Sequence, residues 1–294
     1  MENVHSLFRR VRRIEIRTRR LVDQLMGGDY RSIFRGRGME FSDLRPYTEG
    51  DDPRHIDWNV YARTRAPYVK VFSEERELLV LLMIDLSGSL RFGSLNLTKA
   101  ERTAEVAAVL ALAAAGSNDR VGLLTFSDRV HEYHPPAKGR THALALVRRI
   151  LELPDSQAPA DPDAALAFAG RLLKRRALVF LVSDFRFPTG SRLLGAAVAR
   201  HDVVGVHVFD PRELLLPSIG LVRFRNPETG VERVVDTGSP AWRKRFTEEV
   251  RREQEAREEL CHRTGLDLVS ISTSDDLVLP LRRFFELRKR RRHR

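Results

Sequence analysis

The fold is decided by the stretch Leu78-Leu79-Val80-Leu81-Leu82-Met83-Ile84, which runs directly into Asp85-Leu86-Ser87-Gly88-Ser89. Such a run is apolar on both faces of a strand and is too short for a buried helix. It is typical of a central strand in a parallel sheet that helices cover on both sides. The polar residues that follow are expected at the carboxyl end of this strand, where open α/β sheets bind their ligands.

Strand and helix patterns alternate along the rest of the chain. Further buried strands are predicted at 121–126, 177–183, 203–209 and 268–271. Helices are predicted at 98–115, 141–153, 161–174, 191–200, 239–262 and 275–287. A hairpin is predicted where 219–224 and 231–235 flank the turn-forming residues 226–230. This alternation favours an α/β domain with a doubly wound, mostly parallel sheet.

Composition divides the chain into four parts. Residues 1–28 are predicted to form a basic N-terminal helix. Residues 29–76 form a polar collar in which Gly and Asp before Pro mark turns rather than regular elements, apart from a short strand at 68–72. Residues 77–281 form the α/β domain, with a hairpin insertion at 211–240, and residues 282–294 form a basic C-terminal tail.

Composition also excludes several classes of protein. The chain has 294 residues, of which 42% are hydrophobic and 31% charged, so it is not a disordered protein. Cys261 is the only cysteine, which excludes a disulfide scaffold. No apolar run approaches the ~20 residues that cross a bilayer, and no apolar segment follows the N-terminal arginines. We therefore expect a cytoplasmic protein.

The net charge of +11 is concentrated at the two ends. Residues 1–20 hold seven arginines against two glutamates, and residues 282–294 hold eight lysines and arginines against one glutamate. A nucleic-acid-binding domain more often spreads basic charge over a folded face, so no specific nucleic acid is expected. Basic ends fit acidic partner proteins, an anionic membrane surface or plain solvation.

Four polar residues are candidate metal ligands. Asp85, Ser87 and Ser89 place oxygen atoms at alternate positions of one loop, and Asp184 ends another predicted strand. Oxygen ligands with few charges suit Mg²⁺ or Mn²⁺. In the alternative interpretation, the two serines cap the following turn and Asp85 accepts hydrogen bonds from backbone amides.

Other constellations are weak. His131 and His134 lie in a predicted loop, without a further ligand nearby to complete a zinc site. Cys261 lies near a helix end and is predicted to be a buried thiol rather than a nucleophile. The sequence contains no Gly-x-Ser-x-Gly elbow and no Gly-x-x-x-x-Gly-Lys-Ser/Thr loop. We therefore predict that the protein is not an enzyme.

Two sequence blocks carry a resemblance to known proteins. The apolar strand followed by Asp-x-Ser-x-Ser, with a later Ser-Asp-Phe, resembles a von Willebrand factor A-like domain, whose metal site is the metal-ion-dependent adhesion site. The block Glu40-Phe41-Ser42-Asp43-Leu44-Arg45-Pro46-Tyr47, with Gly50-Asp51-Asp52-Pro53-Arg54, Ile56-Asp57-Trp58 and Ala62-Arg63-Thr64, resembles the bacterial family called domain of unknown function fifty-eight. The likeness covers roughly residues 20–210 and implies a Rossmann-like fold.

The resemblance implies a partial metal site. Its ligands would be Asp85, Ser87, Ser89 and Asp184. Another ligand is usually a threonine in a Gly-Gly-Thr-Asp segment, but here Ala160 takes that place. We expect weak binding of Mg²⁺ or Mn²⁺, with neighbouring Asp161 as a further candidate ligand and an open position for a partner's carboxylate.

The resemblance also implies a function, because many members of the family are encoded beside a MoxR-type AAA+ ATPase. We expect a non-catalytic adaptor that acts with such an ATPase and a client protein in protein assembly or maturation. The expected partner-binding residues of the collar are Arg45, Tyr47, Asp51, Arg54, Asp57, Trp58 and Arg63. In the alternative, these residues form ion pairs and the tryptophan packs on the core. The alternative function is binding of an anionic membrane surface or nucleic acid through the arginine-rich ends.

Overall fold

The computed structural model describes residues 40–73, 77–95, 97–152, 156–187 and 192–292. The chain forms two compact units, and Leu78 is the last residue of the small unit, which begins at Phe34. The described part of the large unit runs from Leu79 to Arg292. The predicted helix at 1–28 and the first part of the predicted collar lie outside the described residues.

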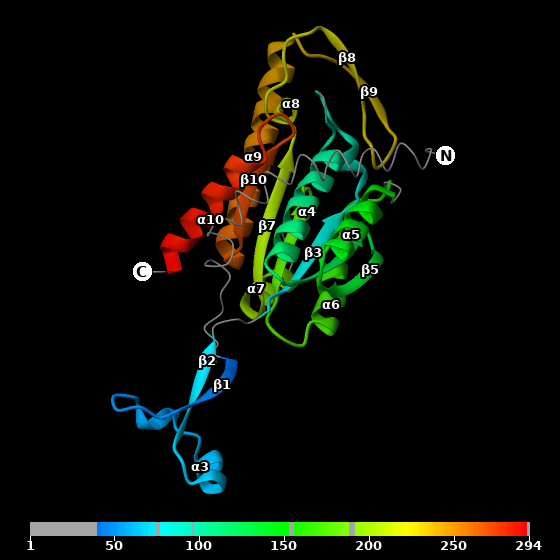
Figure 1. Cartoon of the computed structure of the whole chain (residues 1–294). Helices are drawn as coiled ribbons and strands as arrows, with labels where there is room; N and C mark the ends of the chain where they lie inside the picture. Colours follow the sequence, from blue (N-terminus) through cyan, green and yellow to red (C-terminus); the bar gives the residue numbers. More distant parts are fainter. Residues whose placement is uncertain (1–39, 74–76, 96, 153–155, 188–191, 293–294) are drawn as a thin grey trace. The chain divides into compact units, whose positions relative to one another are not determined.

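The large unit is built on a six-stranded sheet in the order β10-β7-β6-β3-β4-β5 (Figure 1). The strands are β3 (Leu79–Asp85), β4 (Arg120–Phe126), β5 (Val130–Ala137), β6 (Leu178–Ser183), β7 (Asp202–Phe209) and β10 (Asp267–Ser272). Only β5 is antiparallel to its neighbour. The predicted doubly wound, mostly parallel sheet is therefore confirmed, with the apolar strand β3 near its centre.

The predicted helices are also confirmed, with ends that differ by a few residues. They are α4 (Lys99–Gly116), α5 (Arg140–Glu152), α6 (Pro162–Leu172), α7 (Arg192–Arg200), α9 (Pro240–Thr264) and α10 (Val278–Arg292). Two further short turns are η2 (Gly88–Arg91) and α8 (Pro211–Leu214). Local signals fix the ends: Thr98 and Glu101 form a capping box before α4, and Gly265 ends α9 with a φ of 70°.

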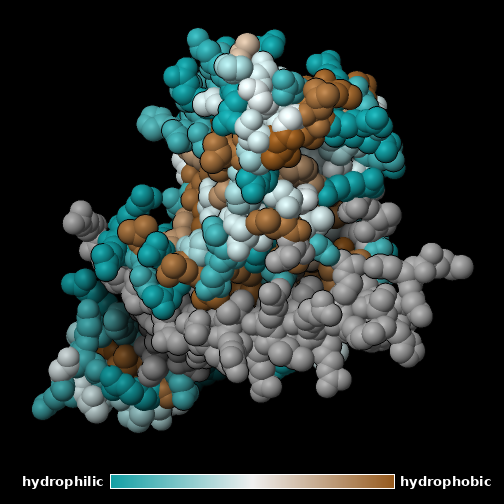
Figure 2. All heavy atoms as spheres, turned by 90° about the horizontal axis from the view of Figure 1, so that it is seen from above, coloured by the Kyte–Doolittle hydropathy of each residue, from teal (hydrophilic) through white to brown (hydrophobic). Residues whose placement is uncertain are grey.

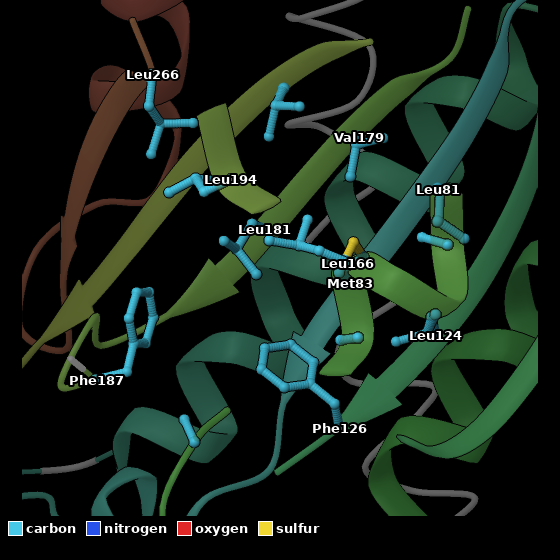
Figure 3. Close-up of a cluster of buried hydrophobic side chains, with 14 of the residues drawn as sticks. Leu81, Met83, Leu124, Phe126, Leu166, Val179, Leu181, Phe187, Leu194 and Leu266 are labelled. Carbon is cyan, nitrogen blue, oxygen red and sulfur yellow. The ribbon is translucent and has the colours of Figure 1, made fainter. Parts of the chain in front are cut away.

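Helices cover both faces of the sheet. Leu81 and Met83 of β3 belong to one buried cluster with side chains of α6, α7 and α9, shown in Figure 3. Because side chains alternate along a strand, Val80, Leu82 and Ile84 point to the opposite face, where they are fully buried. Helix α4, which is buried along most of its length, contacts β3 and β4. The two-sided burial explains why β3 is a continuous apolar run.

The predicted hairpin is present in the large unit. It consists of β8 (Leu221–Arg225) and β9 (Glu232–Asp236), which pair antiparallel. The ring of Trp242 on α9 stacks on Phe224 of β8, with centroids 6.3 Å apart, and attaches the hairpin to the helix. Because β10 is an edge strand of the main sheet, the segment after the hairpin continues this sheet.

The small unit contains more regular structure than predicted. Strand β1 (Glu40–Pro46) pairs antiparallel with β2 (Tyr68–Ser73), and helix α3 (Trp58–Thr64) follows the short turn η1 (Pro53–His55). The interpretation of this stretch as turns without regular elements is wrong for β1 and α3. A bulge between Phe41 and Asp43 interrupts the alternation that marks a strand, and the pairing partner is distant in sequence.

A second correction concerns His131 and His134, which lie on strand β5 rather than in a loop. This strand contains Pro135 and Pro136, which are turn signals in a sequence but are tolerated in an edge strand. The His131 Nε2 atom lies 2.7 Å from Ser127 Oγ, and His134 Nε2 lies 3.1 Å from Glu132 Oε2.

A third correction concerns the basic end. Helix α10 continues to Arg292, so most of the predicted tail at 282–294 is helical. The Arg288 guanidinium, mostly buried, pairs with Asp202 of β7, and its Nε lies 3.0 Å from Asp267 Oδ2 of β10. This pairing holds the helix on the sheet edge. Among the described residues, no helix is both long and apolar enough to cross a membrane.

We predict that Arg288→Ala lowers the free energy of unfolding by about 1.5–3 kcal/mol, because two carboxylates lose their charged hydrogen-bond donor. Arg290→Ala on the exposed side of the same helix is the matched control and should change the free energy of unfolding by less than about 0.5 kcal/mol. Urea unfolding followed by circular dichroism measures both changes. Equal effects of the two substitutions would contradict this account of α10.

Candidate functional site

Two neighbouring parallel strands bring the candidate aspartates together. Strand β3 ends at Asp85, and β6 ends at Ser183, one residue before Asp184. The strands pair in register with Ile84 opposite Val182. Both carboxylates therefore lie at the same carboxyl end of the sheet, as predicted, and both side chains are buried.

Asp85 is held by hydrogen bonds to both of its carboxylate oxygens. Ser183 Oγ donates to Oδ2 at 2.6 Å, and the backbone amide of Ser87 donates to Oδ1 at 2.7 Å. Burial, and then the charge of Asp184, raise the pKa of Asp85 to about 6, although these hydrogen bonds act in the opposite direction. The carboxyl group is thus fixed in place rather than free to move.

The two serines continue this network. Ser87 Oγ lies 3.1 Å from Ser89 Oγ, and Ser89 forms a side-chain hydrogen bond with Asp184. Ser87 is the N-cap residue of η2, but its side chain makes no capping hydrogen bond. The structure therefore brings together four of the predicted ligands. Of the alternative interpretation, in which the serines cap a turn and Asp85 accepts hydrogen bonds from backbone amides, only the hydrogen bond to Asp85 is present.

The centre of the site is occupied by Lys99, which sequence reasoning missed. Its side chain is fully buried, and Nζ lies 2.7 Å from Asp184 Oδ2 and 2.8 Å from Glu213 Oε1. Lys99 is the first residue of α4, where the helix dipole disfavours a cation. A lysine at the start of an apolar helix was thus the available signal that this side chain has an acidic partner.

The charge of Lys99 lowers the pKa of Asp184. Burial alone would raise the pKa of Asp184, but the ammonium and the hydrogen bonds from Lys99 and Ser89 lower it below its ordinary value. Phe185 follows with a φ of 57°, which is uncommon for a bulky residue and costs about 1–2 kcal/mol. This bend lets the backbone amide of Arg186 donate to Asp184 Oδ1 at 3.3 Å.

A second layer of charges lies around this pair. Arg186 Nη1 is 3.5 Å from Glu213 Oε1, and its Nη2 is 3.3 Å from Glu253 Oε2 on α9. Glu213 also closes a capping box, in which its Oε2 accepts a hydrogen bond from the Asp210 amide at 3.1 Å. Residues from α4, α8, α9 and the loop after β6 are therefore joined by one network.

The turn of the β8–β9 hairpin covers the loop that carries the serines. A Cβ atom added to Gly88 would lie 3.0 Å from Pro227 O and 3.3 Å from Ser156 O. The neighbouring Glu228 is partly buried, and burial followed by the charge of Asp184 raises its pKa, while Arg186 and Lys99 act in the opposite direction. The hairpin thus brings a carboxyl group within electrostatic range of the site.

The remaining candidate ligands have other contacts. Asp161 is the N-cap of α6, and its Oδ1 accepts hydrogen bonds from the amides of Asp163 at 2.9 Å and Ala164 at 3.4 Å. Ala160 is buried in the apolar cluster and offers no side-chain oxygen. Within the described ranges, no three His, Cys, Asp or Glu side chains are grouped so that they could hold a metal ion. The role of Asp161 as a ligand stays a prediction.

The predicted partner-binding residues lie in the small unit. Arg45 forms two hydrogen bonds with Asp51, at 2.7 and 2.6 Å, and Asp57 caps α3. Trp58 is 64% exposed and makes an edge-to-face contact with Tyr61, so packing of this tryptophan on a core is wrong. Tyr47 is partly buried, whereas Arg54 and Arg63 are exposed.

We predict that Gly88→Ala displaces the hairpin turn and lowers the free energy of unfolding by about 1–3 kcal/mol, because the new methyl group meets backbone atoms. Gly170→Ala in α6 is the control, since nothing lies within 4 Å of its added Cβ atom. This control should raise the free energy of unfolding by about 0.5–1 kcal/mol. Hydrogen exchange at residues 226–230 would show the displacement; unchanged exchange in Gly88→Ala would contradict the contact.

The chain has relatives among uncharacterized mycobacterial proteins. It is 31% identical over 283 residues to an uncharacterized protein of Mycobacterium tuberculosis strain H37Rv, covering 95% of this chain and 89% of that protein. It is 31% identical over 169 residues to an uncharacterized protein of Mycobacterium avium, covering 53% of this chain and 94% of that protein.

Solved structures with similar folds have low sequence identity. An aerotolerance-related membrane protein from Bacteroides fragilis is 14% identical with a TM-score of 0.48, covering 73% of this chain and 99% of that one. Protein BatB from Bacteroides thetaiotaomicron is 13% identical with a TM-score of 0.47, covering 72% and 99%. The von Willebrand factor A domain of SpRpn10 is 13% identical with a TM-score of 0.38, covering 69% and 92%.

The large unit has the α/β architecture of a von Willebrand factor A-like domain: a mostly parallel sheet between helices, with an Asp-x-Ser-x-Ser loop at the carboxyl end of a central strand. Residues 43–256 match a family whose description is "Protein of unknown function DUF58". Together with the mycobacterial relatives, this match shows that the chain belongs to the DUF58 family.

Proposed function

We propose that the protein is a non-catalytic interaction adaptor, and that its binding face is the hairpin end of the large unit. The observation that carries this proposal is a set of exposed apolar side chains on the hairpin and the segment leading to it. They are Leu215, Ile219, Leu221, Val231 and Val234. Figure 2 looks onto this end and shows hydrophobic residues gathered among hydrophilic ones. Exposed apolar patches with polar surroundings are typical of protein interaction sites.

The polar groups beneath the hairpin favour binding over catalysis. A general base must come within hydrogen-bond distance of its substrate, whereas Asp85 and Lys99 are buried and hydrogen-bonded inside the protein. Ser127 and His131 are in contact, but the Ser127 side chain is fully buried and also bonds Asp128. These groups stabilise the end of the sheet and position its loops.

Leu221→Ser combined with Val234→Ser tests the binding face. We expect the double variant to keep the fold and to bind its partner at least ~10-fold more weakly, a loss of about 1.4 kcal/mol. Leu287→Ser, at a leucine of α10 that is 58% exposed, is the control and should bind like the wild type. Affinity is measured by biolayer interferometry against the co-purifying partner. Equal affinity of all three proteins would exclude the hairpin as the binding face.

A MoxR-type AAA+ ATPase is the partner that the family resemblance favours, and the protein would act with it and a client protein in the cytoplasm. The small unit offers a second surface for such a contact, because Trp58 and Tyr61 are exposed beside the exposed arginines Arg54 and Arg63. Tryptophan, tyrosine and arginine are the residues that most often dominate the binding energy of interfaces.

Trp58→Ala should weaken binding to a MoxR-type ATPase from the same genome by about 2 kcal/mol, or roughly 30-fold, if Trp58 is a central contact. Arg290→Ala, at an exposed residue of α10 that belongs to neither proposed surface, is the control and should bind like the wild type. The measurement is calorimetry with the purified ATPase in the presence of ATP. The ATPase proposal fails if the wild-type chain shows no association at micromolar concentrations with or without nucleotide.

A further inference from the structure

The candidate metal ligands of this site are already engaged by groups of the protein. Asp184 Oδ2 lies 2.7 Å from the Lys99 ammonium. Both oxygens of Asp85 accept hydrogen bonds, and the hydroxyl groups of Ser87 and Ser89 face each other. Ala160 replaces the remaining oxygen ligand with a buried methyl group. The residues present therefore fit a divalent metal ion poorly.

The ammonium of Lys99 is fixed from three separate elements. Its own backbone begins α4, Asp184 follows β6, and Glu213 belongs to α8. Glu213 cannot turn away easily, because its other oxygen accepts the hydrogen bond from the Asp210 amide. Lys99 is fully buried and has two carboxylate partners, at 2.7 and 2.8 Å. Solvent therefore does not compete for these contacts as it does for an ion pair on the surface.

A divalent ion could enter only if the Lys99 side chain left the site. Two positive groups within a few ångströms of each other repel strongly where water is excluded. If Lys99 left the site, the carboxylates of Asp184 and Glu213 would lose the cation between them, and the contact between α4 and α8 would break. The buried lysine therefore excludes from the site the ion that the loop sequence suggests.

We propose that the Lys99 ammonium is the permanent cation of this site, and that it replaces a divalent metal ion in holding together the carboxyl ends of β3 and β6. The site is then complete in the apo protein, and neither folding nor partner binding requires Mg²⁺ or Mn²⁺. This inference does not depend on the adaptor proposal, because it is tested without a partner.

The test is titration of the full-length protein with MnCl₂, followed by electron paramagnetic resonance of free Mn²⁺. In the wild type, we expect this site to show no saturable Mn²⁺ binding with a dissociation constant below about 1 mM. Lys99→Met, which leaves Asp184 and Glu213 without their cation, should gain Mn²⁺ binding by at least ~10-fold in affinity. Lys244→Met, an exposed lysine on α9, is the matched control and should behave like the wild type.

Asp184→Asn identifies the site of any binding that is observed. Mn²⁺ binding to the wild type that persists in Asp184→Asn takes place outside this site. In that case, additional Mn²⁺ binding in Lys99→Met supports the proposal. Wild-type binding with a dissociation constant below about 1 mM that is lost in Asp184→Asn would overturn the proposal.

The melting temperature of the wild type gives a second readout that does not require the Lys99 variant to fold. It should change by less than about 1 °C between EDTA and 5 mM MgCl₂, because only a bound ion stabilises the folded state. A rise of several degrees that Asp184→Asn abolishes would also overturn the proposal.

Discussion

The large unit depends on the buried ion pair between Lys99 and Asp184. Two charges that are removed from water are tolerated only when they are paired and their other hydrogen-bonding groups are satisfied. Glu213 accepts the second hydrogen bond of the ammonium, and Ser89 bonds the carboxylate. Loss of one partner would leave an uncompensated buried charge, which costs about 3–5 kcal/mol. This pair therefore fixes how α4, α8 and the loop after β6 meet at the end of the sheet.

The hairpin gives this end of the sheet its outer surface. Its turn lies against Gly88, and Trp242 stacks on Phe224 to attach it to α9. The charges beneath it are paired with one another, so they are better suited to holding the surface in shape than to binding a partner directly. In the adaptor role that we propose, recognition would fall to the apolar side chains of the hairpin, which solvent reaches.

Local patterns were sufficient to predict most of the fold. The apolar run of β3 and the turn-forming residues 226–230 of the hairpin each act through neighbouring residues, so a single sequence reveals them. Strand β5 was missed because its prolines look like turn signals, and β1 because its partner strand is distant. The aspartate and serine positions of the site were predicted, since parallel strands end at one edge. The partners of Lys99 were not, because a contact over 114 residues leaves no local pattern.

We propose that the cation at this site belongs to the chain itself. A crystal structure of the full chain grown with MnCl₂ would distinguish Lys99 from a bound ion, through the anomalous scattering of manganese. We expect Lys99 Nζ within hydrogen-bond distance of Asp184 and Glu213, and no anomalous peak within coordination distance of Asp184. A manganese peak bonded to Asp184 and Ser89, with the Lys99 side chain displaced, would contradict it.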